Sequence, residues 1–178
     1  LGGIAKKHKV DLDMLIDAFA ITARVHKNCK LLFVGDFGYR EKLEQRVRRK
    51  KLQKRVVFTG RYPRTQLGSI YATADAFVFP SLTDTQGLVL NEAAHAGLPF
   101  VWCDKYVNGV VVDGINGFLA KNNVQDFADA LTLLMGDSET RQSFSAHSQR
   151  LANKFTEEKM TKQLEYEIMR LVTRSRST

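Results

Sequence analysis

Two acidic residues, Asp84 and Glu92, stand eight positions apart in the segment FPSLTDTQGLVLNEAAHAGLP, residues 79–99. We expect Asp84 in a loop after a buried strand and Glu92 about a turn and a half into the following helix. With about 1.5 Å of rise per helical residue, their carboxylates would lie about 10 Å apart, farther than the roughly 5 Å of a retaining glycosidase pair. This spacing favours acids that hold two ends of one ligand. For each acid alone, helix capping or a surface charge is the alternative.

The turn between these acids is suited to binding an anion. Asp84 and Thr85 are residue types that cap a helix, and that helix would start near Gly87. The first amides of a helix have no acceptor within it, so those of Gln86, Gly87 and Leu88 would face the crevice beyond the strand end. Gly87 lets a phosphate approach the backbone closely, and the helix dipole adds about 0.3 to 1 kcal/mol for a charge placed there.

The elements that would position this turn alternate along the chain. Hydrophobic periodicity predicts helices over 12–25, 39–52, 64–73 and 87–96, and short apolar runs predict strands over 31–34, 56–59, 76–79 and 99–103. Such strands are typical of parallel sheets covered on both faces. The pattern therefore predicts an α/β fold, a Rossmann-like doubly wound parallel sheet flanked by helices, with any ligand at the carboxyl ends of the strands.

The second half of the chain is less regular. The stretch VVVDGINGFLA, residues 110–120, is ambiguous between strand and loop. Helices are expected over about 124–136, 139–153 and 156–172, and Thr156 before two glutamates suits the start of the last one.

Composition excludes several classes of protein. The chain has 178 residues, 44% of them hydrophobic, and only 3 prolines, which is typical of a packed globular domain rather than a disordered or collagen-like chain. Its 2 cysteines, Cys29 and Cys103, cannot form a disulfide framework and lack zinc-site spacing. We interpret both as core thiols of a protein in a reducing compartment, the cytoplasm.

The positive charge is concentrated in one stretch. The net charge is +8, and residues 40–64 contain eleven basic and two acidic residues. Such a patch suits a nucleic acid or an anionic membrane. The run RVRRKKLQKR, residues 46–55, has no aromatic side chain to stack on a base, which argues against nucleic acid. A solvated helix face and peripheral attachment to the inner face of the membrane remain as alternatives.

Metal and dinucleotide chemistry have little support. The four histidines are scattered, and none pairs with another at metal-ligand spacing. Asp11 and Asp13 form a DxD pattern that could suggest a metal, yet they precede a predicted helix, where acids cap. No GxGxxG and no P-loop occurs, which disfavours nicotinamide enzymes and ATPases.

Four stretches in the same order resemble the retaining glycosyltransferases of family 4, which have the GT-B fold: VGDFGYREKLE, VVFTGRYPRTQLGSIYATADAFVFPS, PSLTDTQGLVLNEAAHAGLP and VVDGINGFLA. The resemblance covers nearly the whole chain. It implies that residues 1–178 are a single nucleotide-sugar-binding domain, the C-terminal half of an enzyme whose N-terminal domain binds the acceptor. The fragment alone is expected to be inactive.

The resemblance also implies roles for individual residues. Glu92 would accept hydrogen bonds from the ribose hydroxyls of a nucleotide sugar. Asp84 stands where the family has Glu, one methylene shorter, and would hold the transferred sugar. The backbone from Thr85 to Leu88 would contact the sugar and its phosphates. The base would lie near the loop of Gly60, Arg61 and Tyr62.

The family neutralises the donor diphosphate with an Arg and a Lys in the loop after its first strand. Gly3 stands at the Arg position here. Of the nearby lysines, Lys7 and above all Lys9 are expected to contact the donor. A solvated loop is the alternative.

The function implied is transfer of a hexose from a nucleotide-diphosphate sugar, most simply one like UDP-glucose, to a lipid or saccharide acceptor, with retention and without a metal or other cofactor. Two alternatives stay open: a GT-B nucleotide-sugar epimerase, which needs no acceptor, and a non-enzymatic basic module that binds nucleic acid.

Overall fold

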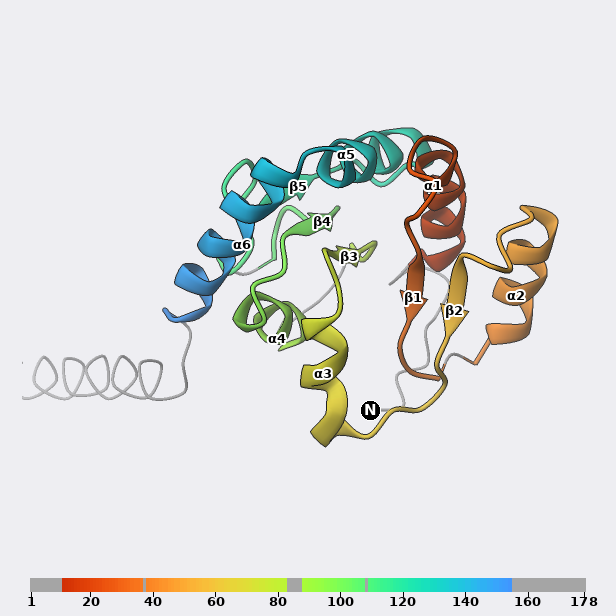
Figure 1. Ribbon diagram of the computed structural model, residues 1–178, viewed down its shortest axis with the longest axis horizontal. Coiled ribbons are helices and arrows are strands. Elements are labelled where there is room, and N and C mark those ends of the chain that lie inside the picture. Colours follow the sequence, from red (N-terminus) through yellow and green to blue (C-terminus); the bar gives the residue numbers. More distant parts are fainter. Residues whose placement is uncertain (1–10, 37, 83–87, 108, 155–178) are drawn as a thin grey trace, which may run out of the picture.

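The computed structural model describes residues 11–36, 38–82, 88–107 and 109–154 (Figure 1). Several sequence predictions lie outside the described residues. They concern Gly3, Lys7, Lys9, the loop from Asp84 to Gly87, and the helix expected over 156–172 with Thr156 at its start.

Helices and strands alternate along the described chain. The helices are α1 (Leu12–Val25), α2 (Arg40–Arg49), α3 (Leu67–Ala72), α4 (Leu88–His95), α5 (Val124–Gly136) and α6 (Ser138–Ala152), with a 3-10 turn η1 (Arg64–Gln66) before α3. The strands are β1 (Leu31–Phe33), β2 (Val56–Phe58), β3 (Phe77–Phe79), β4 (Phe100–Trp102) and β5 (Gly117–Leu119). Each element predicted within the described residues is present, and β5 is an additional strand from the ambiguous stretch.

The strand pairs among the described residues are all parallel. β1 pairs with β2, with Leu32 opposite Val57. β4 lies between β3 and β5, with Val101 opposite both Val78 and Phe118. The described strands thus form two parallel sheets, one of two strands and one of three. α2 connects β1 to β2 and α4 connects β3 to β4, as parallel neighbours require, whereas β4 and β5 are joined by a segment without a described helix. The predicted α/β architecture is confirmed.

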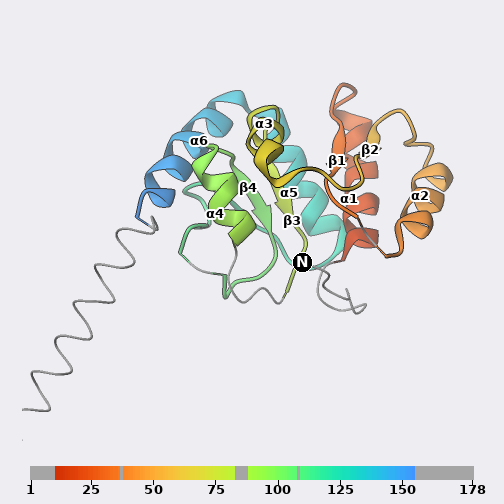
Figure 2. The same ribbon diagram turned by 90° about the horizontal axis from the view of Figure 1, so that it is seen from below.

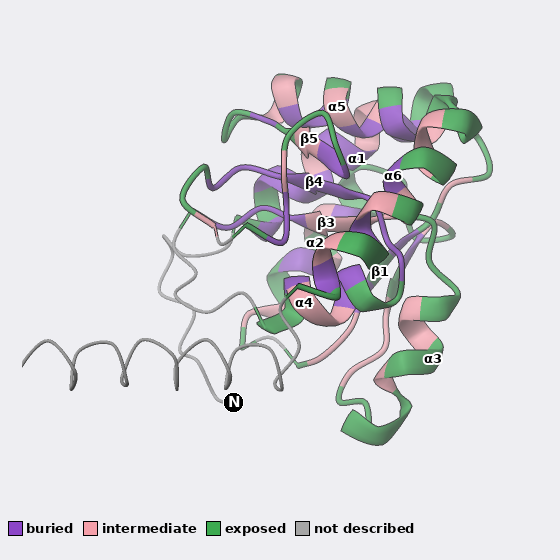
Figure 3. Cartoon of the chain, turned by 90° about the vertical axis from the view of Figure 1, so that its left-hand side faces the viewer, coloured by how far each residue is buried: buried purple, intermediate pink, exposed green. Residues whose placement is uncertain are grey.

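The helices cover both sides of the strands. Figure 1 shows α1 and α5 along one side and α3 and α4 along the other, and α6 packs against α4. Buried residues gather in the strands and on the inward faces of the helices (Figure 3). Phe100 of β4 and Phe127 of α5 are fully buried, so each sheet is positioned by apolar packing rather than by its short ladders alone.

The two acids at the start of α1 have structural partners. The Asp11 carboxylate accepts a 2.8 Å hydrogen bond from the backbone amide of Met14, which makes Asp11 the N-cap of the helix. Asp13 lies in the first turn, 3.3 Å from the Arg46 guanidinium of α2. The interpretation of these residues as a helix start is confirmed.

The two cysteines differ in burial. Cys103 is buried, and this burial raises its pKa to about 12, so the thiol stays protonated. Cys29 is only partly buried, and its thiol donates to the carbonyl of His26. The prediction of a core thiol is therefore confirmed for Cys103, whereas Cys29 is only partly buried and packs against the edge of the core.

A cluster of ion pairs joins α1 to α2. The Asp17 carboxylate, 16% exposed, accepts a 2.9 Å hydrogen bond from Arg46 Nε and lies 3.1 Å from Lys50 Nζ. The hydrogen bond from Arg46 lowers the pKa of Asp17, and Lys50 adds to the effect. Two residues of the basic stretch thus form ion pairs that hold α2 against α1.

Replacing Asp17 by Asn should lower the free energy of unfolding by about 1 to 2 kcal/mol at pH 7, because Arg46 and Lys50 lose their charged acceptor. Because the pKa of Asp17 is lower in the folded state than in the unfolded state, its carboxylate stabilises the fold at pH values above the unfolded-state pKa. This stabilisation is lost as the pH falls through the folded-state pKa. In urea unfolding, the difference between wild type and variant should therefore shrink from pH 7 to about pH 3. Asp13→Asn is the control, because its carboxylate is 52% exposed. An equal loss at both pH values would contradict the assignment.

Candidate functional site

Glu92 lies on α4, the helix that follows the carboxyl end of β3. Leu90, Ala93 and Ala94 form the buried face of this helix, and Glu92 lies beside that face with its side chain 36% exposed. Its carboxylate has two described neighbours. The Tyr71 hydroxyl donates a 3.0 Å hydrogen bond to Oε2, and Arg64 Nη2 lies 3.7 Å from Oε1.

Both neighbours come from the segment before β3. Arg64 opens η1 and is 80% exposed, whereas Tyr71 on α3 is partly buried and packs its ring 6.1 Å from that of Phe77. α3 and α4 lie side by side in Figures 1 and 2. Sequence reasoning missed both residues, because nothing in their spacing shows that α3 packs beside α4.

The electrostatics keep Tyr71 a neutral donor. Burial of the phenol, together with the Glu92 charge and hydrogen bond, raises the pKa of Tyr71 above its usual range. The hydroxyl therefore keeps its proton at physiological pH and donates to the carboxylate.

The predicted base-binding loop lies at the carboxyl ends of β1 and β2. Gly60 has a φ of 69°, and its carbonyl accepts a 3.0 Å hydrogen bond from the Gly35 amide. Arg61 lies 3.5 Å from the Asp36 carboxylate, and both side chains are mostly exposed. Tyr62 is 39% exposed. The chain continues from this loop into η1, where Arg64 reaches Glu92, so the structure brings the loop and Glu92 to one side of the fold.

A backbone contact ties the start of α1 to the end of β3. The amide of Asp11 donates a 2.8 Å hydrogen bond to the carbonyl of Pro80. Asp11 directly follows the lysine-containing segment, and Pro80 directly follows β3. Leu88, the first residue of α4, is 52% exposed. The loop from Asp84 to Gly87 lies outside the described residues, so its roles and those of Lys7 and Lys9 stay predictions.

Metal-binding groups are not clustered in the described part of the chain. No group of three or more His, Cys, Asp or Glu gathers there. His26 and His147 each contact a backbone carbonyl, that of Thr132 at 3.0 Å and that of Ser143 at 2.8 Å. Within the same residues, no helix has the length and apolar character to cross a membrane.

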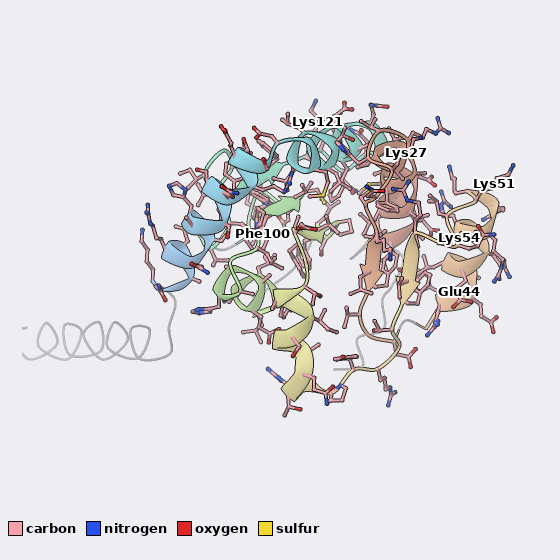
Figure 4. All side chains as sticks on the ribbon, viewed as in Figure 1. Lys27, Glu44, Lys51, Lys54, Phe100 and Lys121 are labelled. Carbon is pink, nitrogen blue, oxygen red and sulfur yellow. The ribbon has the colours of Figure 1, made fainter. Side chains whose placement is uncertain are left out.

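The basic stretch divides into internal and exposed charges. Arg55 donates to the carbonyls of Ala23 and Cys29 near the end of α1, at 2.6 and 3.1 Å. The Ala23 carbonyl lies in the last turn of α1, where carbonyls lack a donor within the helix, and Cys29 lies in the turn that follows. Lys51 and Lys54 are exposed beside α2 (Figure 4). Binding of an anionic membrane by the exposed charges stays a prediction.

A Rossmann-like α/β fold with polar side chains at the carboxyl ends of its strands is the arrangement that binds nucleotides. The chain belongs to the glycosyl transferases group 1 family, whose sequence model matches residues 5–151. The resemblance noted from the sequence motifs is thereby confirmed at the level of this family.

Curated relatives include a sulfoquinovosyl transferase and a glycolipid synthase. The sulfoquinovosyl transferase SQD2 of Arabidopsis thaliana is 35% identical over 118 residues, 64% of this chain and 22% of the relative. An alpha-monoglucosyldiacylglycerol synthase of Acholeplasma laidlawii is 32% identical over 110 residues, 61% of this chain and 28% of the relative. The chain thus spans less than a third of either relative.

Solved structures share the fold. The Anabaena protein Alr3699/HepE, crystallised with UDP and glucose, is 26% identical with a TM-score of 0.76 over 89% of this chain and 44% of that protein. The pneumococcal O-GlcNAc transferase GtfA, crystallised with UDP and GlcNAc, is 20% identical with a TM-score of 0.81 over 94% of this chain and 34% of that protein. These glycosyltransferase neighbours confirm the predicted GT-B class of fold.

Proposed function

We propose that this chain is the donor-binding domain of a retaining hexosyltransferase that takes a nucleotide-diphosphate sugar like UDP-glucose. The observation that carries the proposal is the partly exposed Glu92 carboxylate, held by Tyr71 and paired with Arg64, which follows the loop after β2. An oriented carboxylate is a strong acceptor for ribose hydroxyls. The UDP and glucose bound by the Anabaena protein support this class of ligand.

The diphosphate would bind between Glu92 and the start of α1. The hydrogen bond from Asp11 to Pro80 holds the start of α1 at the end of β3, where the predicted amides of Gln86 to Leu88 and the side chain of Lys9 would meet. Negative charge develops on the leaving diphosphate as the bond to the anomeric carbon breaks. Losing one preorganised donor at such a site typically costs about 100- to 1000-fold in rate.

The acceptor is proposed to be a lipid or saccharide, because the Acholeplasma laidlawii relative is named as the synthase of a glycolipid. It would bind to a further domain, and the leaving phosphate would take the acceptor's proton. The chain by itself is expected to bind the donor without transferring sugar. An epimerase would instead convert the donor with no acceptor present, so product analysis of the complete enzyme with and without acceptor separates the two functions.

Replacing Asp84 by Asn should separate the two parts of the donor. If Asp84 holds only hydroxyls of the transferred sugar, binding of UDP should stay within about 2-fold, while affinity for UDP-glucose falls about 10-fold, the loss of one charge-assisted hydrogen bond. Calorimetry measures both affinities, and a melting curve serves as the control. A lower melting temperature with equal weakening of both ligands would show instead that Asp84 caps α4.

Nucleotide binding is proposed to need no divalent metal, because backbone amides and lysines supply the positive charge at the diphosphate. We expect calorimetry with UDP to give the same dissociation constant with EDTA as with added Mg²⁺. A tenfold weaker affinity in EDTA would contradict this proposal.

A further inference from the structure

The two oxygens of the Glu92 carboxylate have different surroundings. Oε2 accepts the Tyr71 hydroxyl at 3.0 Å, on the partly buried side of the contact. Oε1 lies 3.7 Å from Arg64 Nη2, beyond hydrogen-bond length, and the Arg64 side chain is 80% exposed. Among the described residues, Oε2 is thus engaged by a hydrogen bond, whereas Oε1 has only the longer ion-pair contact with Arg64 and can accept from a further donor.

The Tyr71 hydroxyl is held in place by its ring. The ring packs beside Phe77 at 6.1 Å, and Phe77 in turn packs against the fully buried Phe100 at 5.9 Å. An aromatic side chain fixed this way has little rotational freedom left, in contrast to the flexible chain of a half-exposed glutamate. The hydrogen bond transmits this order to Glu92.

We propose that Tyr71 is a positioning residue, whose phenol orients the Glu92 carboxylate so that Oε1 faces the ribose hydroxyls of the nucleotide. This inference rests on the proposed role of Glu92. Because Tyr71 orders the carboxylate in the free protein, the ligand does not have to restrict the Glu92 side chain when it binds. Tyr71 therefore strengthens binding without touching the ligand.

The test is a double-mutant cycle with Tyr71→Phe and Glu92→Ala, using UDP and 2′-deoxy-UDP as probes in calorimetry. Phe keeps the packing against Phe77 and removes only the hydroxyl. We expect Tyr71→Phe to weaken the affinity for UDP about 3- to 10-fold in the wild-type background. In the Glu92→Ala background the affinity should fall less than about 2-fold, because the hydroxyl then has no carboxylate to position. The preference for UDP over 2′-deoxy-UDP should fall in Tyr71→Phe as well.

The matched control is Tyr106→Phe, since Tyr106 is 82% exposed and contacts Lys105 rather than an acid. It should leave both affinities unchanged. All measurements are made below the lowest melting temperature of the variants. A general loss of structure would weaken the affinity for UDP equally in both backgrounds and leave the preference for UDP over 2′-deoxy-UDP unchanged.

The outcomes separate the two proposals. If Glu92→Ala weakens UDP but Tyr71→Phe does not, or does so equally in both backgrounds, the positioning role is overturned while the donor site stands. If Glu92→Ala leaves UDP binding unchanged, the proposed function of Glu92 fails, and the positioning role fails with it.

Discussion

Replacing Glu92 by Gln should weaken binding of UDP and of UDP-glucose alike, by about 10- to 100-fold. Gln has the same shape and retains an oxygen that can accept from Tyr71, so the variant removes charge and little else. Hydrogen bonds to a charged group contribute about 1.5 to 3 kcal/mol, which corresponds to this range of affinity. Both ligands carry the ribose, so both should lose the same free energy in calorimetry.

The chain offers a matched control in Glu44 on α2 (Figure 4). Its carboxylate is 32% exposed and lies 2.7 Å from Arg40 Nε, an environment comparable to that of Glu92. Glu44→Gln should leave both affinities unchanged. If Glu92→Gln bound UDP as tightly as wild type, Glu92 would be an ordinary helix residue.

Replacing Gly117 by Ala should destabilise the fold by about 2 to 4 kcal/mol. Gly117 lies opposite Phe100 in the register of β4 and β5, and a Cβ atom added there would stand 2.3 Å from the Phe100 carbonyl oxygen. The obstacle is backbone of a fully buried residue, which cannot rotate away, so β5 must shift. Urea unfolding at constant pH measures the loss.

Gly68→Ala is the contrasting variant. Gly68 lies inside α3, and an added Cβ atom would meet nothing within 4 Å. Alanine is favoured over glycine within a helix by about 0.8 to 1 kcal/mol, so this variant should be more stable than wild type. A Gly117→Ala protein as stable as wild type would contradict the close packing of β5 on β4.

Local signals allowed much of the fold to be predicted. The apolar stripe of α1 and its N-cap, Asp11, can be recognised from residues close together in the sequence. The same holds for the short apolar runs that form β1 to β4. β5 could not be assigned because it begins with Gly117, a residue that weakens strands on their own. Its place depends on the close approach to Phe100, a contact between distant parts of the chain.

The site was predictable only in part. Glu92 could be selected by its residue type and its distance from Asp84, both visible in the sequence. Tyr71 lies 21 positions before Glu92, and their contact exists only because the fold places α3 beside α4 (Figure 1). The basic stretch shows the same limit, since only the fold reveals that Arg46 and Lys50 are used to hold Asp17.

The central claim is that this domain binds a nucleotide diphosphate through its ribose at Glu92. The most direct measurement is calorimetric titration of the wild-type chain with UDP, followed by the same titration with 2′-deoxy-UDP. We predict saturable binding of UDP at one site, competition by UDP-glucose, and affinity about tenfold weaker for the deoxy compound, because one hydrogen bond to the carboxylate is lost. Equal affinity for the two nucleotides, or no binding of UDP at millimolar concentration, would contradict the account.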